Sequence, residues 1–158
     1  MDEFVQVVRD GPAAGIGDAV VLEYSRREKT RQRAQLESGE EIAIKLPRGT
    51  VMRGGDCLRT AHGRTVRVVS GREQVSTVYA SAADVLARVA YHLGNRHVWL
   101  QVGPGWVRYL ADHVLDDMVR GFGLEPAAEV AAFEPEGGAY SSHGHSHTGG
   151  SGGAGHEH

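Results

Sequence analysis

The sequence predicts an α+β protein in which a small all-β domain is followed by a mixed domain and a long polar tail. Three observations lead to this fold class. Residues 1–73 contain short β-branched runs separated by turn residues. Helical spacing of apolar residues begins only after Ser81. From Glu136 on, glycine, serine and histidine replace the apolar residues that a core needs, so residues 136–158 are expected to form a disordered tail.

The first domain, residues 1–73, is predicted to be built from strands joined by tight turns. The alternation is clearest in residues 41–46, where Ile42 and Ile44 would face the core and their neighbours the solvent. Chain breakers such as PRGT at 47–50 and RGGD at 53–56 separate the runs. The predicted strands cover residues 4–8, 19–24, 31–36, 41–46 and 65–69.

The second domain, residues 74–135, has the predicted order β-α-β-β-α-β, which is that of a ferredoxin-like fold. The first helix would begin with Ser81 and Asp84 as a capping box and end at Gly94, with a left-handed turn sustained by Asn95. Asp112 would cap the second helix, which Gly123 would end. The predicted strands cover residues 75–80, 98–102, 106–110 and 129–133.

Charge and composition exclude several classes of protein. Residues 1–74 carry 13 Lys and Arg against 11 Asp and Glu, whereas residues 75–158 carry 4 against 9. An acidic, histidine-rich half favours cations over nucleic acid. No apolar run is long enough for a membrane helix, and the N-terminus lacks the apolar segment of a signal peptide. We therefore expect a cytoplasmic protein that binds neither nucleic acid nor membrane.

The tail holds five of the nine histidines, in the pattern SSHGHSHTGGSGGAGHEH. An expression tag would carry an unbroken run of histidines, and this tail alternates them with glycine and serine. Neutral imidazole binds Ni²⁺, Zn²⁺ and Cu²⁺, and small spacers let several rings reach one ion. Such ligands must be ordered on binding, which favours capture and release of a metal over catalysis. The candidate tail ligands are His143, His145, His147, His156 and His158.

Three further histidines lie in the second domain, and for two of them a structural reading stays open. His92, near the end of the first helix, and His113, at the start of the second, could equally be ordinary helix residues. His97 follows the helix stop. The chain has no H-E-x-x-H, P-loop or G-x-S-x-G, so no enzyme is predicted. Cys57 is expected in a strand, and the basic stretch 25–33 on a solvated surface because it has no aromatic residue to stack a base.

Several stretches of the chain, taken in order, are specific to one family. They are YHLGNRH at 91–97, RYLADHVLDDM at 108–118, GFGL at 121–124 and FEPEGGAY at 133–140, followed by the histidine tail. LPRGT at 46–50 and GRTVRVV at 63–69 add to the pattern. Over nearly its whole length the chain resembles the UreE family of urease accessory proteins, which are nickel metallochaperones.

The resemblance implies a cytoplasmic homodimer with a peptide-binding-like N-terminal domain and a metal-binding second domain. It implies delivery of Ni²⁺ to the urease apoprotein together with other accessory proteins, including a GTPase. His97 would bind nickel at the dimer interface, and His92 and His113 match secondary metal positions. Some relatives have a histidine where this chain has Ala111, so less binding is expected around His113. The alternative function is a histidine-rich protein that sequesters Ni, Zn or Cu without a urease client.

Overall fold

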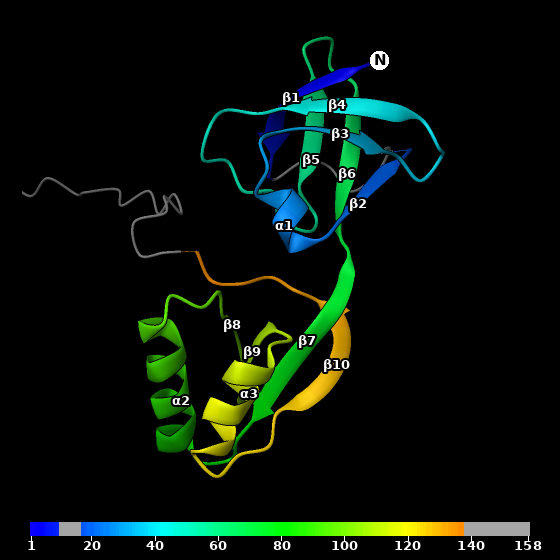
Figure 1. Cartoon of the computed structure of the whole chain (residues 1–158). Coiled ribbons are helices and arrows are strands. Elements are labelled where there is room, and N and C mark those ends of the chain that lie inside the picture. Colours follow the sequence, from blue (N-terminus) through cyan, green and yellow to red (C-terminus); the bar gives the residue numbers. More distant parts are fainter. Residues whose placement is uncertain (10–16, 138–158) are drawn as a thin grey trace, which may run out of the picture.

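The computed structural model describes residues 1–9 and 17–137, which form two sheets joined through consecutive strands (Figure 1). The first sheet has six strands in the order β2-β6-β5-β1-β4-β3, and a single-turn helix α1 lies beside it. Its elements are β1 (Glu3–Val8), β2 (Ala19–Leu22), α1 (Tyr24–Arg27), β3 (Arg31–Gln35), β4 (Glu41–Lys45), β5 (Cys57–Thr60) and β6 (Thr65–Ser70).

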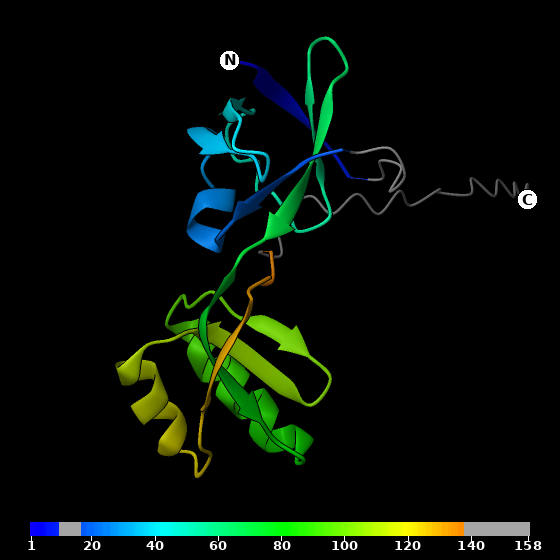
Figure 2. The same ribbon diagram turned by 90° about the vertical axis from the view of Figure 1, so that its right-hand side faces the viewer.

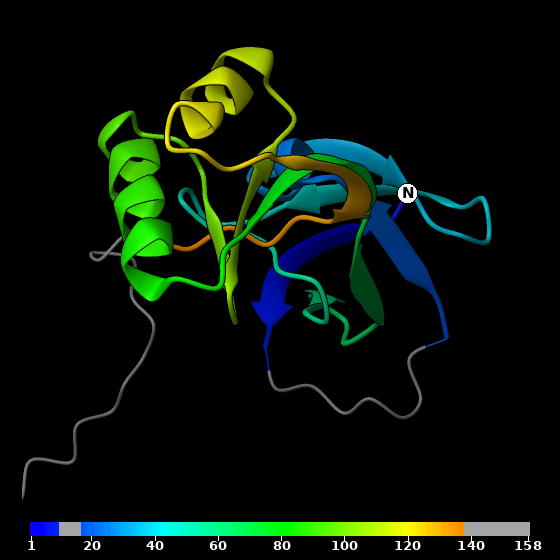
Figure 3. The ribbon, with the colours of Figure 1, turned by 90° about the horizontal axis from the view of Figure 1, so that it is seen from below.

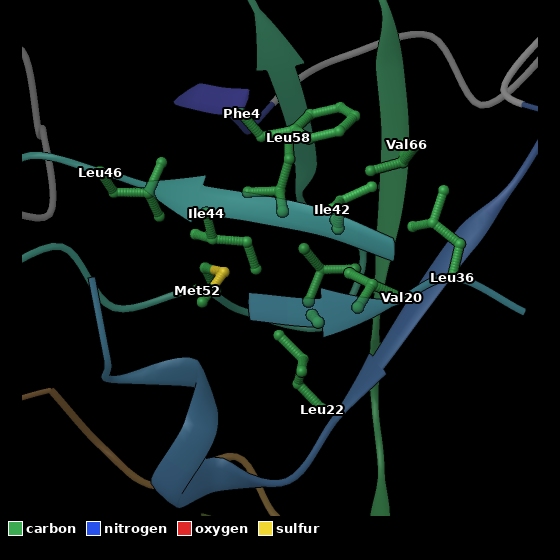
Figure 4. Packing of buried hydrophobic residues seen from close by; sticks show 12 residues of the cluster. Phe4, Val20, Leu22, Leu36, Ile42, Ile44, Leu46, Met52, Leu58 and Val66 are labelled. Atoms are coloured by element: carbon green, nitrogen blue, oxygen red, sulfur yellow. The ribbon is translucent and has the colours of Figure 1, made fainter. Parts of the chain in front are cut away.

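The core of the first unit forms where the inward positions of these strands meet (Figure 4). Ile42 and Ile44 are fully buried, whereas Glu41 and Lys45 are exposed, as the alternation predicts. Ala43, which points to the opposite side of β4, is also buried, so this position departs from the predicted alternation. Each fully buried aliphatic side chain contributes about 1.5–3 kcal/mol relative to an exposed one. The core residues with no more than 1% exposure are Phe4, Val20, Leu22, Ile42, Ile44, Met52, Leu58, Val66 and Val68.

The strand predicted at residues 98–102 begins only at Gln101, and the strand predicted at residues 19–24 is two residues too long. The latter strand ends at Leu22, and Tyr24 begins helix α1 instead. The amide of Tyr24 donates to the Glu73 carboxylate at 2.8 Å, so a partner 49 residues away fixes the point where the chain leaves the sheet. Such a long-range contact leaves no trace in the local pattern of β-branched residues.

The second sheet carries two helices on one face and is shown from two further sides in Figures 2 and 3. Its four strands have the order β10-β7-β9-β8, and every neighbouring pair is antiparallel. Side chains of both helices join those of β7 and β9 in one apolar cluster. The predicted element order β-α-β-β-α-β is confirmed. The elements are β7 (Arg72–Tyr79), α2 (Ala83–Asn95), β8 (Gln101–Gly103), β9 (Trp106–Leu110), α3 (His113–Arg120) and β10 (Ala127–Ala132).

The helix ends agree with the sequence at Asp112 and differ in the other three cases. Helix α3 ends at Arg120, with Gly121 as its C-cap, and not at Gly123 as predicted. Asp112 caps α3, and its carboxylate accepts from the amides of Val114 and Leu115 at 2.8 and 3.2 Å. Helix α2 starts after Ala82 with no side-chain cap, so the capping box predicted at Ser81 is wrong. The helix also continues through Gly94, which was predicted to end it.

A third apolar cluster joins the two units. Tyr24 of α1 packs edge-on against Phe133, with ring centroids 5.7 Å apart, and both contact Val75 of β7. The Trp99 ring also lies 5.7 Å from the Tyr24 ring, centroid to centroid. The chain passes from β6 to β7 through Gly71, whose amide donates to the Leu22 carbonyl at 2.8 Å. The junction therefore contains residues from α1, from β7 and from the segments before β8 and after β10.

Candidate metal-binding site

The end of helix α2 fixes the position of His97. The amide of His97 donates to the carbonyl of Gly94 at 3.0 Å, and the amide of Val98 donates to the carbonyl of Leu93 at 3.3 Å. These two bonds, closing after the C-cap residue Arg96, form a Schellman motif. The residue just past the cap must then adopt a left-handed backbone, and His97 does so with φ of 59°.

Glycine is the usual residue at this point of a helix end, and His97 replaces it. Within residues 1–9 and 17–137 it is the only non-glycine residue with positive φ. A left-handed conformation costs a residue with a Cβ about 1–2 kcal/mol, although histidine tolerates it better than most. Strain of this kind persists mainly at functional positions. The left-handed turn predicted at Asn95 lies instead at His97, because Asn95 is the last helical residue.

The surroundings of His97 are exposed and partly aromatic. Its own side chain is exposed, and Tyr91 and Trp99 nearby in the chain are 69% and 50% exposed. In the part of the chain that the structure describes, no three His, Cys, Asp or Glu side chains come together as a metal-binding group. Within the described residues, His97 therefore belongs to no group of three side chains that could hold a metal ion.

His92 and His113 lie in other surroundings. The His92 ring is 5.0 Å from Phe122 and 5.3 Å from Tyr91, so it packs at the edge of the apolar cluster under α2 and α3. His113 is the exposed first residue of α3, next to the capping Asp112. The structure does not gather these two histidines with His97 into one group of three ligands.

The five tail histidines, His143, His145, His147, His156 and His158, lie outside the described residues. The chain just before the tail is held in place by a backbone hydrogen bond. The amide of Glu136 donates to the carbonyl of Leu100 at 2.8 Å, which holds this segment against the loop between α2 and β8. In Figure 1 the segment, drawn in orange, runs toward this loop from the end of β10.

Two polar residues have more specific roles than the sequence indicates. Arg27, expected on a solvated surface with the rest of the stretch 25–33, is fully buried at the junction. Asp116 of α3 accepts from the Tyr109 hydroxyl at 2.6 Å. Burial, together with this hydrogen bond, raises the pKa of Tyr109 far above its usual value. Cys57 lies buried in β5, so its placement in a strand is confirmed.

Comparisons with known proteins agree with this arrangement. The profile of the N-terminal domain of the UreE urease accessory protein matches residues 3–70, and that of its C-terminal domain matches residues 73–158. The chain belongs to the UreE family. In this UreE family member the boundary between the two profiles falls at Gly71, between β6 and β7. None of the helices in residues 1–9 and 17–137 is long and apolar enough to cross a membrane.

Three curated relatives, each named urease accessory protein UreE, show the extent of the similarity. The protein from Pseudomonas putida (strain W619) is 53% identical over 132 residues, covering 83% of this chain and 82% of its own. That from Alkalilimnicola ehrlichii is 52% identical over 130 residues, covering 82% and 80%. That from Proteus mirabilis is 42% identical over 146 residues, covering 89% and 91%. The similarity to UreE proteins therefore includes both sheets.

Proposed function

We propose that this UreE family member is a cytoplasmic, homodimeric nickel carrier that has no catalytic activity of its own. It would deliver Ni²⁺ to the urease apoprotein together with further accessory proteins, including a GTPase. The curated relatives support the urease client, since they carry the name urease accessory protein over four fifths or more of their own length. The antiparallel β-α-β-β-α-β unit would be the ferredoxin-like metal-binding domain.

The observation that carries the proposal is the position of His97. It is exposed, held in a strained helix end, and part of no group of three potential ligands within the described residues. A two-fold axis beside it would add a second, identical imidazole from the partner subunit. The neighbouring exposed aromatic residues Tyr91 and Trp99 would supply apolar surface for such an interface.

The tail would supply the remaining ligands. His143 follows Glu136 by seven residues, and seven residues span at most about 25 Å when fully extended. The Cα of His97 lies no more than about 11 Å from that of Leu100, to which Glu136 is bonded. The covalent chain therefore lets His143 and the two histidines after it reach His97. His156 and His158 would bind further ions, with His92 and His113 as secondary positions.

This ligand set suits a carrier. Two His97 side chains leave coordination positions open, and tail imidazoles that occupy them must lose conformational freedom to do so. Binding is therefore reversible, and a partner with a complete ligand set can take the ion. Imidazole also binds Zn²⁺ and Cu²⁺, with Cu²⁺ favoured by the general order of affinity, so we expect both to compete with Ni²⁺.

The proposal is tested by nickel titration with mass measurement of the oligomer. A variant with all five tail histidines replaced by alanine should bind about one Ni²⁺ per dimer. Adding His97→Ala to that variant should abolish this binding, and adding His92→Ala, the matched control, should leave it. Full binding after His97→Ala would contradict a central site at this residue.

The alternative function is sequestration of Ni, Zn or Cu without a urease client. It shares the ligands, so the measurement that separates it is urease activity in cells that lack this protein. The nickel-carrier proposal expects reduced activity that added nickel restores. Unchanged urease activity would favour sequestration.

A further inference from the structure

The segment after β10 connects the two units before the tail begins. Its first residue, Phe133, is buried against Tyr24, and its carbonyl accepts from the buried guanidinium of Arg27. Two residues later the Pro135 carbonyl accepts from Arg53 at 2.6 Å. These contacts bind the chain to the first unit immediately after it leaves the second sheet.

Glu134 is the residue at which the contacts converge. Its Oε1 accepts from the amide of Gly54 at 2.8 Å, and its Oε2 lies 2.9 Å from Nη1 of Arg27 and 3.5 Å from Nη1 of Arg53. The approach to Arg27 is an ion pair without the angles of a hydrogen bond. The amide of Glu134 meanwhile donates to the Gln101 side chain at 3.1 Å.

The charge of Glu134 is needed because Arg27 is fully buried. A guanidinium cannot lose its proton in a protein, so a buried arginine requires a carboxylate beside it. Glu134 is 27% exposed at its side chain and is the carboxylate nearest to Arg27 among the ion pairs of the described residues. The pair therefore ties residue 134 to the junction more strongly than a surface pair would.

On its other side the same segment touches the loop that carries His97. Glu134 bonds to Gln101, and Glu136 bonds to Leu100, three residues after His97. Held in this way, the chain leaves the described structure beside that loop. Released from these contacts, it would be anchored no further along than Phe133, which is buried and bonded to Arg27.

We propose that Glu134 is a positioning residue, which the Arg27, Arg53 and Gly54 groups of the first unit hold so that the histidine tail starts beside His97. The inference deepens the proposed function and rests on it. It also gives the first unit a part in nickel binding although none of its residues is a ligand. The arginine side chains of the first unit thus determine where the histidine tail, which follows the second unit, begins.

The matched pair of variants is Glu134→Gln and Glu136→Gln. Both remove one negative charge from the same segment, but the exposed Glu136 bonds through its backbone amide, which the substitution leaves in place. A third variant, Gly54→Ala, displaces Glu134 from the opposite side. A Cβ at position 54 would lie 2.8 Å from Glu134 Oε1, so the carboxylate must move.

The first readout is the position of the tail, measured without metal on the full chain. A nitroxide on Ser141→Cys broadens the amide signals of nearby residues, and buried Cys57 does not compete for the label. Position 141 follows Glu136 by five residues, a span of at most about 18 Å, and follows Phe133 by eight residues, a span of up to about 29 Å. We expect strong broadening at residues 96–100 in the parent and in Glu136→Gln, reduced by half or more in Glu134→Gln and Gly54→Ala.

The second readout is the first nickel dissociation constant. Lengthening the free segment before His143 from seven to ten residues lowers the effective concentration of the tail about 1.7-fold. Glu134→Gln should weaken binding by about that factor in the full chain, and should change nothing when the five tail histidines are alanine. A loss of folding alone would weaken both.

The outcomes separate this inference from the function on which it rests. Equal broadening of residues 96–100 in Glu134→Gln and Glu136→Gln overturns the role of Glu134, whatever the nickel result. If the broadening changes as expected but His97→Ala keeps its nickel, the positioning stands and the central site at His97 is wrong.

Discussion

The amide of Val98 donates to the carbonyl of Leu93 across the end of helix α2, and this bond encloses His97 in a left-handed backbone. The site therefore puts a residue with a Cβ where folding favours glycine. An imidazole fixed in this way cannot drift with a fraying helix end. Backbone strain is the energetic cost of that fixed position. A variant that relieves the strain should therefore be more stable than the parent protein.

His97→Gly should stabilise the fold while it removes the nickel ligand. Relief of the left-handed backbone, offset by the greater freedom of glycine in the unfolded chain, should raise the free energy of unfolding by about 0.5–1 kcal/mol. The melting temperature should rise by about 2–4 °C, as measured by calorimetry without metal. The matched change His92→Gly lies within the helix and should destabilise by about 1 kcal/mol. A lower melting temperature in His97→Gly would show that the backbone is unstrained.

Arg27→Met should destabilise the protein by about 2–4 kcal/mol, because it removes one partner of a buried pair and leaves the other. The carbonyls of Phe133 and Met52 also lose their donor. Urea unfolding measures the change. Arg26→Met is the control: it removes a neighbouring, partly buried arginine that bonds to Gln32 and Arg33, and should cost less than about 1.5 kcal/mol. Equal effects would mean that the buried pair contributes nothing particular.

Asp112→Ala should lower the free energy of unfolding by about 1 kcal/mol, since it leaves two amides at the start of α3 without their acceptor. Asp117→Ala on the same helix removes an exposed carboxylate paired with Arg120 and should stay within about 0.5 kcal/mol. Thermal unfolding of both variants distinguishes them. Equal losses of stability in the two variants would show that the Asp112 cap does not stabilise α3.

Glu129 should make stability depend on acid pH. Its hydrogen bond from the Tyr79 hydroxyl, followed by that from Thr77 and the charge of Arg108, lowers the pKa of this carboxyl below its usual 4.5. The ionised form is favoured in the folded state, so its contribution is present above pH 4.5 and is lost as the pH falls through the lowered pKa. Glu129→Gln should therefore unfold more easily at neutral pH and show a shallower acid dependence. If the stability of Glu129→Gln fell with acid pH as steeply as that of the parent protein, this expectation would be contradicted.

The parts of the fold that the sequence predicts are those with local causes. The alternation of Ile42 and Ile44 follows from one buried sheet face, and the cap at Asp112 needs only two amides within three residues. Helical spacing places α2 and α3 because their apolar stripes cover one sheet face. Each of these signals lies within a dozen residues, so a single sequence is enough to find it.

The features that escaped prediction depend on distant partners. Arg27 is buried because of a carbonyl 106 residues away, so its stretch looks like a solvated surface when it is taken alone. The end of helix α2 is an exception, since its closing bonds are local. They form around His97, whereas glycine is the residue that usually marks a helix end. For the metal site, His97 could be named from a family motif, but neither its strained backbone nor the tail root beside Leu100 has a local signal. The tail ligands stay a prediction, since they lie outside the described residues.

The bond between Glu136 and Leu100 has a consequence for protein engineering. It makes the last described residues a ready attachment point, one at which any peptide fused after Gly137 starts its course close to Leu100, three residues after His97. A designed chelating sequence could then replace the natural tail. The two folded units would fix where this sequence starts and in which direction it leaves. Metal preference could be tuned in this way by rewriting the terminus alone, without a single change inside either sheet.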